Sequence, residues 1–204
     1  MYPKKYEIVK VSVDPVIFTI QQGRIKVLLQ RREKEPFKGL PELPGGLLLA
    51  HETGEETLQR KLQEIISDGT IFFTQFYTFT QPDRDPRERT VSIGFVALVN
   101  EQKIKSWNNW VDTQELTELA FDHLKIIQAA RTFLKENSGP SLIKHFLPSY
   151  FPLNQLQEVY ELLESKKYDN RNFRKKMISS GLVEETKKIE KEVSHRPAKL
   201  FRFV

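Results

Sequence analysis

The chain of 204 residues is long enough to bury a core, either as one large domain or as two small ones. It has no cysteine, which excludes disulfides and thiolate metal sites and favours a reducing, cytoplasmic compartment. No apolar run approaches the roughly 18 residues of a membrane-spanning helix, so a membrane is not expected among its partners.

The net charge of +5 is unevenly distributed. From Pro140 onward there are thirteen Lys and Arg residues and eight Asp and Glu residues, whereas the preceding part has nineteen of each. All of the excess positive charge therefore lies in the last third of the chain. This asymmetry favours a nucleic-acid partner there, with a solvated basic surface as the alternative.

The first half of the sequence predicts strands and one helix. Two β-branched runs separated by a Gly-containing turn predict a hairpin, an amphipathic segment with apolar residues on one face predicts a helix, and two further apolar runs predict strands. In chain order these segments are Val11–Ile20, Ile25–Gln30, Thr53–Ile66, Ile71–Thr80 and Arg89–Val99.

The rest of the chain predicts mainly helices. A short capped helix is expected at Asp112–Leu119 and a longer amphipathic one at Phe121–Lys135, followed by a turn-rich boundary at Asn137–Pro140. Beyond the boundary the pattern predicts two more helices and a small hairpin. These are Leu153–Glu164, then Asn170–Ser180 with Asp169 as N-cap and Gly181 as terminator, then Leu182–Val204.

Four residues around the first helix carry a recognisable spacing. Gly46, Glu52, Arg60 and Glu64, with Leu62 at the aliphatic position, resemble the Nudix box, G-x5-E-x7-R-E-U-x-E-E-x-G-U. The resemblance covers about residues 8 to 135 and includes the Leu-Pro-Gly-Gly entry to the box. It implies an α/β fold, the Nudix α/β/α sandwich with a mixed sheet.

The box lacks carboxylates that Nudix hydrolases use to hold Mg²⁺. Lys61 replaces the first and Ile65 the last, which leaves Glu64 with Glu52 as an outlying helper. We therefore assign no catalytic residue and no metal site, and expect no required cofactor, with Mg²⁺ relevant only if hydrolase activity persists. Glu52 and Arg60 are expected to form a scaffold pair that fixes the loop to the helix, and Glu64 to be a polar residue facing the pocket.

A charged loop follows at Asp83–Arg89. Its arginines, Arg84, Arg87 and Arg89, have guanidinium groups suited to an anionic ligand, although alternating charges also suit a solvated loop. The D-R-D-P-x-x-R-x-V-S run resembles the Nudix branch that contains ADP-ribose pyrophosphatases and the NrtR and AraR transcriptional regulators. The ligand-binding residues expected from this region and from the entry to the box are Gly45, Arg84, Arg87, Arg89 and Ser92. His123 is expected to be a structural histidine.

The C-terminal third resembles the winged helix-turn-helix domain of those regulators, chiefly through the run R-N-F-R-K-K that starts at Arg171. The resulting division is a Nudix-like ligand-binding domain at 1–138 and a small winged helix-turn-helix domain at 139–204. Phe173 and Met177 are expected to anchor the second helix to the core.

The other positions of that helix and the wing supply the expected DNA contacts. A recognition helix directs its N-terminal residues to base edges in the major groove, while neighbouring cations bind phosphate. Docking on an acidic protein surface is the alternative. The base-contacting residues expected are Arg171, Asn172 and Lys175; the phosphate-contacting residues are Arg174, Lys176 and Lys187; and the wing residues are His195, Arg196 and Lys199.

Together these features predict a ligand-responsive transcriptional regulator that binds a double-stranded DNA operator as a homodimer. Its Nudix domain would be catalytically degenerate and would sense a sugar or nucleotide-sugar metabolite, since the resemblance implies ADP-ribose for NrtR-type and arabinose for AraR-type relatives. The alternative from another class is a weak or altered Nudix hydrolase, similar to ADP-ribose pyrophosphatase. A third is an adaptor that binds RNA or protein.

Overall fold

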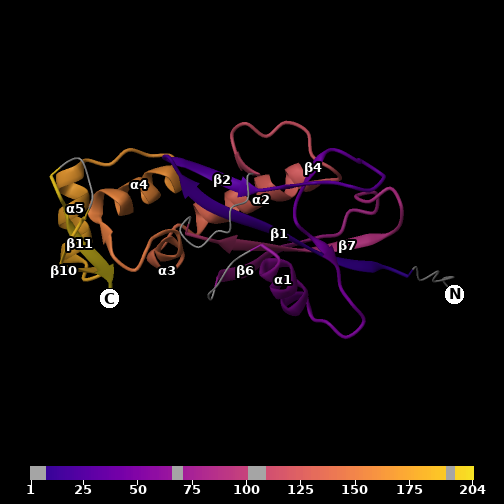
Figure 1. The fold of residues 1–204 in the computed structure, drawn as a ribbon, viewed down its shortest axis with the longest axis horizontal. Helices are drawn as coiled ribbons and strands as arrows, with labels where there is room; N and C mark the ends of the chain where they lie inside the picture. Colours follow the sequence, from indigo (N-terminus) through magenta and orange to yellow (C-terminus); the bar gives the residue numbers. More distant parts are fainter. Residues whose placement is uncertain (1–7, 66–70, 101–108, 192–195) are drawn as a thin grey trace, which may run out of the picture.

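The computed structural model describes residues 8–65, 71–100, 109–191 and 196–204 (Figure 1). Its N-terminal part is built on a sheet with the strand order β6-β7-β1-β2-β8, with β5 paired to β1. Strands β1 and β7 are parallel and the other pairs are antiparallel, so the sheet is mixed. The strands are β1 (Lys10–Gln21), β2 (Arg24–Leu28), β5 (Gly46–Leu47), β6 (Phe72–Phe79), β7 (Thr90–Leu98) and β8 (Trp110–Asp112); β3 (Gln30–Arg31) and β4 (Pro41–Glu42) form a separate pair.

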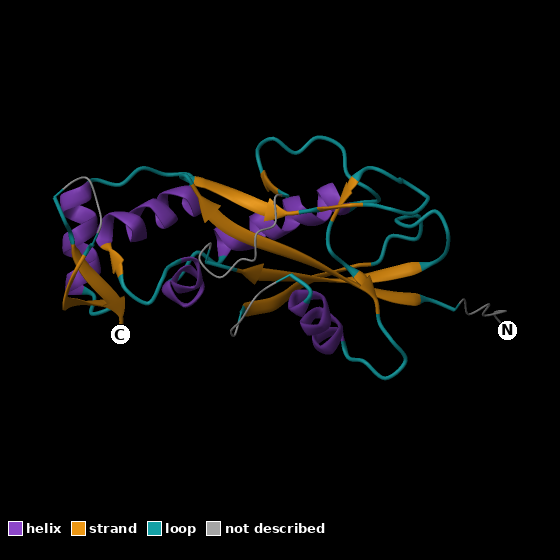
Figure 2. Ribbon diagram, viewed as in Figure 1, coloured by secondary structure: helices purple, strands orange, loops and turns teal. Residues whose placement is uncertain are grey.

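Two helices cover opposite faces of this sheet, α1 (Gly54–Gln63) and α2 (His123–Glu136) (Figures 1 and 2). Side chains alternate along a strand, so β1 serves both faces. Val13 and Ile17 belong to the cluster under α1, whereas Val16 and Phe18 belong to the cluster under α2. This is the α/β/α sandwich with a mixed sheet that the sequence predicts.

The hairpin between β1 and β2 has the predicted position. Its register pairs Phe18 with Val27 and Gln21 with Arg24, and the two turn residues, Gln22 and Gly23, both have positive φ (51° and 69°). Positive φ at both central residues is the requirement of the turn whose twist matches antiparallel strands. The tip of the hairpin reaches the C-terminal part of the chain, because a Cβ on Gly23 would lie 3.0 Å from Glu158 Oε1.

The C-terminal part consists of short helices and a three-stranded sheet in the order β10-β11-β9. Helix α4 ends at Ser165 in the left-handed conformation (φ 54°), and α5 begins at the N-cap Asp169, whose side chain accepts the N–H of Asn172. This is a winged helix-turn-helix. Its elements are α3 (Pro140–Ile143), the 3-10 helix η2 (Lys144–Phe146), β9 (Phe151–Pro152), α4 (Leu153–Glu164), α5 (Asn170–Ser179), β10 (Val183–Ile189) and β11 (Lys199–Phe203).

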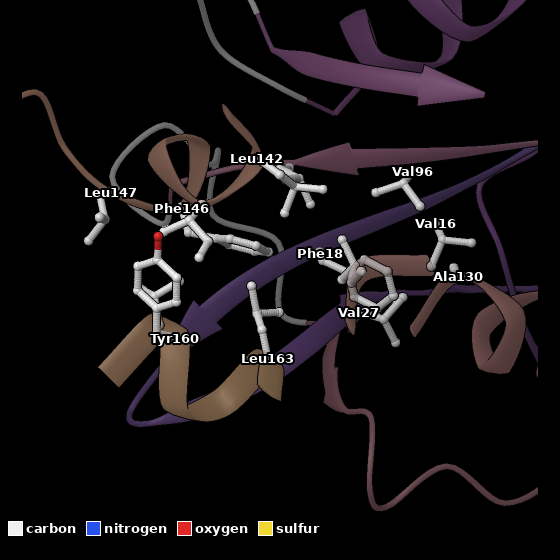
Figure 3. Close-up of a cluster of buried hydrophobic side chains, with 14 of the residues drawn as sticks. Val16, Phe18, Val27, Val96, Ala130, Leu142, Phe146, Leu147, Tyr160 and Leu163 are labelled. Carbon is white, nitrogen blue, oxygen red and sulfur yellow. The ribbon is translucent and has the colours of Figure 1, made fainter. Parts of the chain in front are cut away.

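One continuous hydrophobic core connects the two parts. The cluster that holds Val16 and Phe18 of the sheet also holds Phe146 of η2 and Tyr160 and Leu163 of α4 (Figure 3). A hydrogen bond of 3.1 Å from the Asn100 side-chain amide to the carbonyl of Phe146 joins the same regions. The end of β7 is thus fastened to the start of the winged helix.

The division at 138/139 stays a prediction. Leu142 and Ile143, which lie on its C-terminal side, are buried in the shared core.

Most predicted elements are confirmed, and α4 has the predicted bounds. The short helix predicted at Asp112–Leu119 is wrong, since Asp112 ends β8 and the following residues form a turn. The Asp112 carboxylate accepts the N–H of Gln114 at 2.8 Å, a local bond that favours a turn over a helix. The short strands β4, β5, β8 and β9 and the short helices α3 and η2 were not predicted. Among the described residues, no helix is both long and apolar enough to cross a membrane.

Candidate functional site

The start of α1 fixes the loop that precedes it. Thr53 accepts the N–H of Glu56, and Glu56 in turn accepts the N–H of Thr53, which is a capping box. Glu52 lies just before this cap, and both of its carboxylate oxygens accept hydrogen bonds from the Arg60 guanidinium, each 2.7 Å long. Thr57 and the N–H of Leu49 also donate to Glu52.

The Arg60 guanidinium is the main cause of a lowered Glu52 pKa, about 2. Glu52 and Arg60 therefore have the scaffold geometry that the sequence predicts. Glu64 and Ile65, the two following acidic positions of the box, are not part of this pair. Glu64 is 55% exposed and pairs with Lys61, whose Nζ lies 3.1 Å from Glu64 Oε2, and Ile65 is buried.

The residues of the box do not fit a divalent metal. The Glu52 oxygens are taken by Arg60, the Glu64 carboxylate is paired with an ammonium, and Ile65 has no oxygen to offer. In the part of the chain that the structure describes, no three Asp, Glu or His side chains cluster in a way that could hold an ion. A hard cation needs several oxygen ligands, and a lysine beside it adds repulsion.

A buried charge network lies next to the box on the α2 side of the sheet. Asp14, in the middle of β1, accepts a hydrogen bond of 2.5 Å from the Ser92 hydroxyl and one of 3.2 Å from Arg84. Arg84 also donates two bonds to Asp122, at 2.7 and 3.0 Å, so that its guanidinium lies between two carboxylates. Gly45 packs so closely against Asp14 that its position requires a glycine, because a Cβ there would lie 2.3 Å from Asp14 Oδ1.

His123 completes this network as a neutral side chain. Its Nδ1 accepts the N–H of Leu43 at 2.9 Å, so the proton is on Nε2, which lies 3.8 Å from Asp14 Oδ1. Burial lowers the pKa of His123. Its position agrees with the structural role expected from the sequence.

Two cavities meet at this network. The smaller one, about 130 Å³, is polar and is bordered by Asp14, Gly45, Gly46 and Arg87 among others. The larger, about 660 Å³, is bordered by the exposed aromatic residues Phe37 and Tyr77. Arg84 and Phe121 border both cavities. The Phe121 ring is covered by the guanidinium carbons of Arg32 at 4.6 Å and Arg87 at 5.2 Å.

Of the three arginines of the charged loop, Arg84 and Arg87 border the smaller cavity, whereas Arg89 borders neither of the two cavities. Arg84 is buried between its carboxylates, and Arg87 is half-exposed and held by Asp85 at 2.7 Å. Arg89 donates a hydrogen bond to the carbonyl of Gln81. Ser92 is fully buried under Asp14, so it acts on the cavity only through that carboxylate.

The sequence analysis missed Asp14, Asp122 and Phe121. Asp14 had a detectable signal, an aspartate inside a run of apolar strand residues, where a buried carboxylate requires partners. The contacts of Asp122 and Phe121 could not be assigned from the sequence, because they depend on the tertiary positions of Arg84, Arg32 and Arg87.

Helix α5 presents the second candidate site, a basic surface. Phe173 and Met177 are buried, as predicted, and the other long side chains point outward. Among the described residues, none of the α5 cations makes an ion pair. The exposed polar and basic residues of this helix are Arg171, Asn172, Arg174, Lys175 and Lys176. We call these five residues the α5 basic face.

The wing adds further basic residues. Lys187, Arg196 and Lys199 are exposed, and Lys199 pairs with Glu185 at 2.6 Å. The guanidinium of Arg174 lies 5.4 Å from the Phe201 ring of β11, so it is positioned between α5 and the wing. His195 lies outside the described residues.

The fold and these two sites define a Nudix-fold protein with an appended winged helix. Residues 10–134 match the NUDIX domain, and residues 143–203 match the NrtR DNA-binding winged helix domain. The chain belongs to the NrtR family of Nudix-related transcriptional regulators.

Individual relatives agree with this assignment. The chain is 32% identical to the ADPR responsive transcriptional repressor NtrR of Acinetobacter baylyi, over 94% of this chain and 81% of that protein. It is 32% identical to NrtR of Shewanella oneidensis crystallised with a 27mer DNA, with a TM-score of 0.83 over 95% of this chain and 93% of that one. The chain is also 35% identical to an ADP-ribose pyrophosphatase of Methanocaldococcus jannaschii, over 61% of this chain and 76% of that enzyme.

Proposed function

We propose that the protein is a DNA-binding transcriptional repressor whose Nudix domain senses ADP-ribose and does not hydrolyse it efficiently. The observation that carries the proposal is the contrast within one chain between a paired, metal-poor Nudix box and the unpaired α5 basic face. The paired Nudix box lacks the free carboxylates that a hydrolase needs to bind metal, and the α5 basic face supplies the cations that a regulator needs to bind DNA.

The two adjoining cavities suit a nucleotide-sugar effector. The larger one offers Phe37 and Tyr77, whose rings can stack on a base, and the smaller one offers the glycine backbone of Gly45 and Gly46 beside Arg87. Arg84 and Ser92 would shape the site through Asp14, whereas Arg89 borders neither of these two cavities. ADP-ribose is favoured over arabinose, because both curated relatives are named for ADPR or ADP-ribose.

The α5 basic face suits the major groove. Arg171 and Lys175 lie four residues apart on one side of the helix, Arg171 in the first turn and Lys175 near the middle, and the N-terminal part of a recognition helix contacts base edges. Arg174, Lys176 and Lys187 are then the candidates for phosphate contacts, with Arg196 on the wing. Lys199 is a weaker candidate, since it is compensated by Glu185. Recognition of two half-sites would require a homodimer.

The shared core offers a physical route between effector and DNA. Strand β1 carries Asp14 at the cavity, and further along it Phe18 in the core cluster that includes Tyr160 of α4. Its hairpin tip then lies against Glu158. A shift of β1 on ligand binding would therefore move α4 and, with it, α5.

The experiment measures binding of the full-length protein to DNA from upstream of its own operon, by fluorescence anisotropy, with and without ADP-ribose. We expect specific binding, and a change in DNA affinity of roughly tenfold when ADP-ribose is added, the usual scale of allosteric coupling. DNA binding that ignores ADP-ribose would refute the sensor, and absence of DNA binding would refute the regulator.

The alternative, a Nudix hydrolase, is favoured by the similarity to the pyrophosphatase and is tested separately. The protein is incubated with ADP-ribose and Mg²⁺, and AMP release is followed. We expect AMP release to be slow, and we expect Glu64→Gln to leave its rate unchanged. Rapid release that is lost in Glu64→Gln would establish the enzyme instead.

A further inference from the structure

The polar cavity beside the Nudix box carries no net charge of its own. The described residues that border it include three carboxylates, of Asp14, Glu42 and Asp85, and three guanidinium groups, of Arg32, Arg84 and Arg87. His123 is neutral there, for the reasons given above. A diphosphate that enters this cavity brings negative charge that the cavity wall does not balance.

The guanidinium groups of the wall are not free to supply the balance. Arg84 is 4% exposed and bonded to two aspartates, and Arg32 and Glu42, whose side chains are 11% and 12% exposed, pair at 2.8 Å. Separating such buried pairs leaves an uncompensated charge, which is costly. Arg87 is more exposed, but it is held by both oxygens of Asp85.

Lys61 is the nearby cation that can change partner. Its Cε would lie 3.0 Å from a Cβ on Gly46, so the end of the side chain rests against a residue of the cavity wall. Its partner Glu64 is 55% exposed and three residues away on the same helix. Ion pairs of this kind contribute little to stability, so the ammonium can leave Glu64 at small cost.

We infer that the Lys61 ammonium takes the place of a divalent cation in this Nudix domain, offsetting part of the negative charge of the effector's diphosphate so that the effector binds without metal. The inference rests on the proposed function, since it assigns a residue to the proposed ADP-ribose site. In the Nudix box the position of Lys61 carries a carboxylate, which binds the metal that in turn binds the anion. A lysine at this position can bind the anion directly, so the cavity still accepts an anionic ligand. Lys61 is thus a determinant of effector binding and of independence from Mg²⁺.

The test is calorimetric titration of the full-length protein with ADP-ribose, in EDTA and in Mg²⁺. The wild-type protein should give the same Kd in both buffers to within about twofold. Lys61→Gln should weaken binding in EDTA by about tenfold or more, the usual scale for loss of a charge-assisted hydrogen bond. Lys61→Arg should retain most of the affinity, and Lys61→Glu should bind weakly in EDTA and recover in part with Mg²⁺.

Lys167→Gln is the matched control. Lys167 is also a lysine paired with a glutamate, Glu161 at 2.6 Å, but it is more exposed than Lys61 and lies in the winged helix, so its loss should leave the Kd for ADP-ribose unchanged. A wild-type Kd that rises tenfold in EDTA, or a Lys61→Gln variant that binds as tightly as the wild type, would overturn the inference and leave the proposed effector intact. No ADP-ribose binding by the wild type in either buffer would overturn both.

Discussion

Helices α1 and α5 are both ten residues long and both begin at a side-chain cap, Thr53 in one and Asp169 in the other, yet they use their charged residues in opposite ways. In α1, Arg60 is bonded to Glu52, Lys61 to Glu64, and Glu56 to the backbone of the cap. In α5, the described structure provides no carboxylate partner for any of the basic residues.

This difference between α1 and α5 distinguishes charges that stabilise the fold from charges that are available to bind another molecule. A paired charge on α1 is already satisfied within the chain, so its loss acts on stability. An unpaired charge on α5 gains its interaction only when an external anion arrives, so its loss acts on binding. Lys61 lies between these extremes, because its partner is exposed and easily exchanged.

The largest effect that tests this contrast is expected from Arg171→Ala combined with Lys175→Ala. A good base contact contributes about 1–3 kcal/mol of discrimination, so loss of both should weaken specific DNA binding by about 2–6 kcal/mol, or at least about thirtyfold. Anisotropy with operator DNA measures the effect, and thermal unfolding should be nearly unchanged. Lys166→Ala with Lys167→Ala removes the same charge from the preceding loop and serves as the control. Equal losses from both pairs would mean that the α5 basic face reads no bases.

On the α1 side, Glu52→Gln should lower stability in a pH-dependent way. The pKa of Glu52 is about 2 in the folded chain, against an ordinary value of 4.5, chiefly because Arg60 donates to it. The ionised pair therefore stabilises the fold fully above pH 4.5, and its contribution is lost as the pH falls towards 2.

Thermal unfolding of wild type and Glu52→Gln should differ at pH 7 and converge as the pH approaches 2. Glu161→Gln is the counterpart in the winged helix, where hydrogen bonds from Gln157 and Lys167 lower the pKa of Glu161 to about 2 as well. A difference for Glu52→Gln that does not change with pH would contradict the pairing with Arg60.

The same contrast explains what the sequence could and could not predict. Helix α5 was predictable in position, core anchors and exposed face, because a helical period with Phe173 and Met177 buried leaves the basic residues outside. The pairing of Glu52 with Arg60 was predictable from the Nudix spacing. Both depend on residues close together in the sequence or on a motif with fixed geometry.

The cavity network was only partly predictable, because its partners are distant in the sequence. Arg84 was expected to meet a ligand; it borders both cavities, but its guanidinium is bonded to Asp14 and Asp122, which are 70 and 38 residues away. A guanidinium pattern in a loop indicates an anion partner but does not say whether the anion is a ligand or an aspartate of the same chain. The short helix predicted at Asp112–Leu119 failed for the opposite reason, since a local side-chain bond at Asp112 formed a turn.

The two helix caps offer a smaller and closely matched test. Thr53→Ala and Asp169→Ala should each cost about 1 kcal/mol in the free energy of unfolding, the usual value of a lost N-cap. Only Asp169→Ala should also weaken DNA binding, because it frays the end of α5 that carries Arg171 and Asn172. Urea unfolding and anisotropy on the same samples separate the two effects. A loss of DNA affinity in Thr53→Ala would show that α1 and α5 are not independent.

The smallest effect is expected from Lys187→Ala on the wing. Lys187 is exposed on β10, where it would contact phosphate and not bases. Each phosphate contact releases condensed counterions, so its loss should reduce the slope of log K against log salt concentration by about 1. Preference for the operator over unrelated DNA should stay unchanged, because phosphates carry no sequence information. If Lys187→Ala changed the preference for the operator and left the salt slope unchanged, Lys187 would contact a base edge. The wing would then contribute to base recognition together with α5.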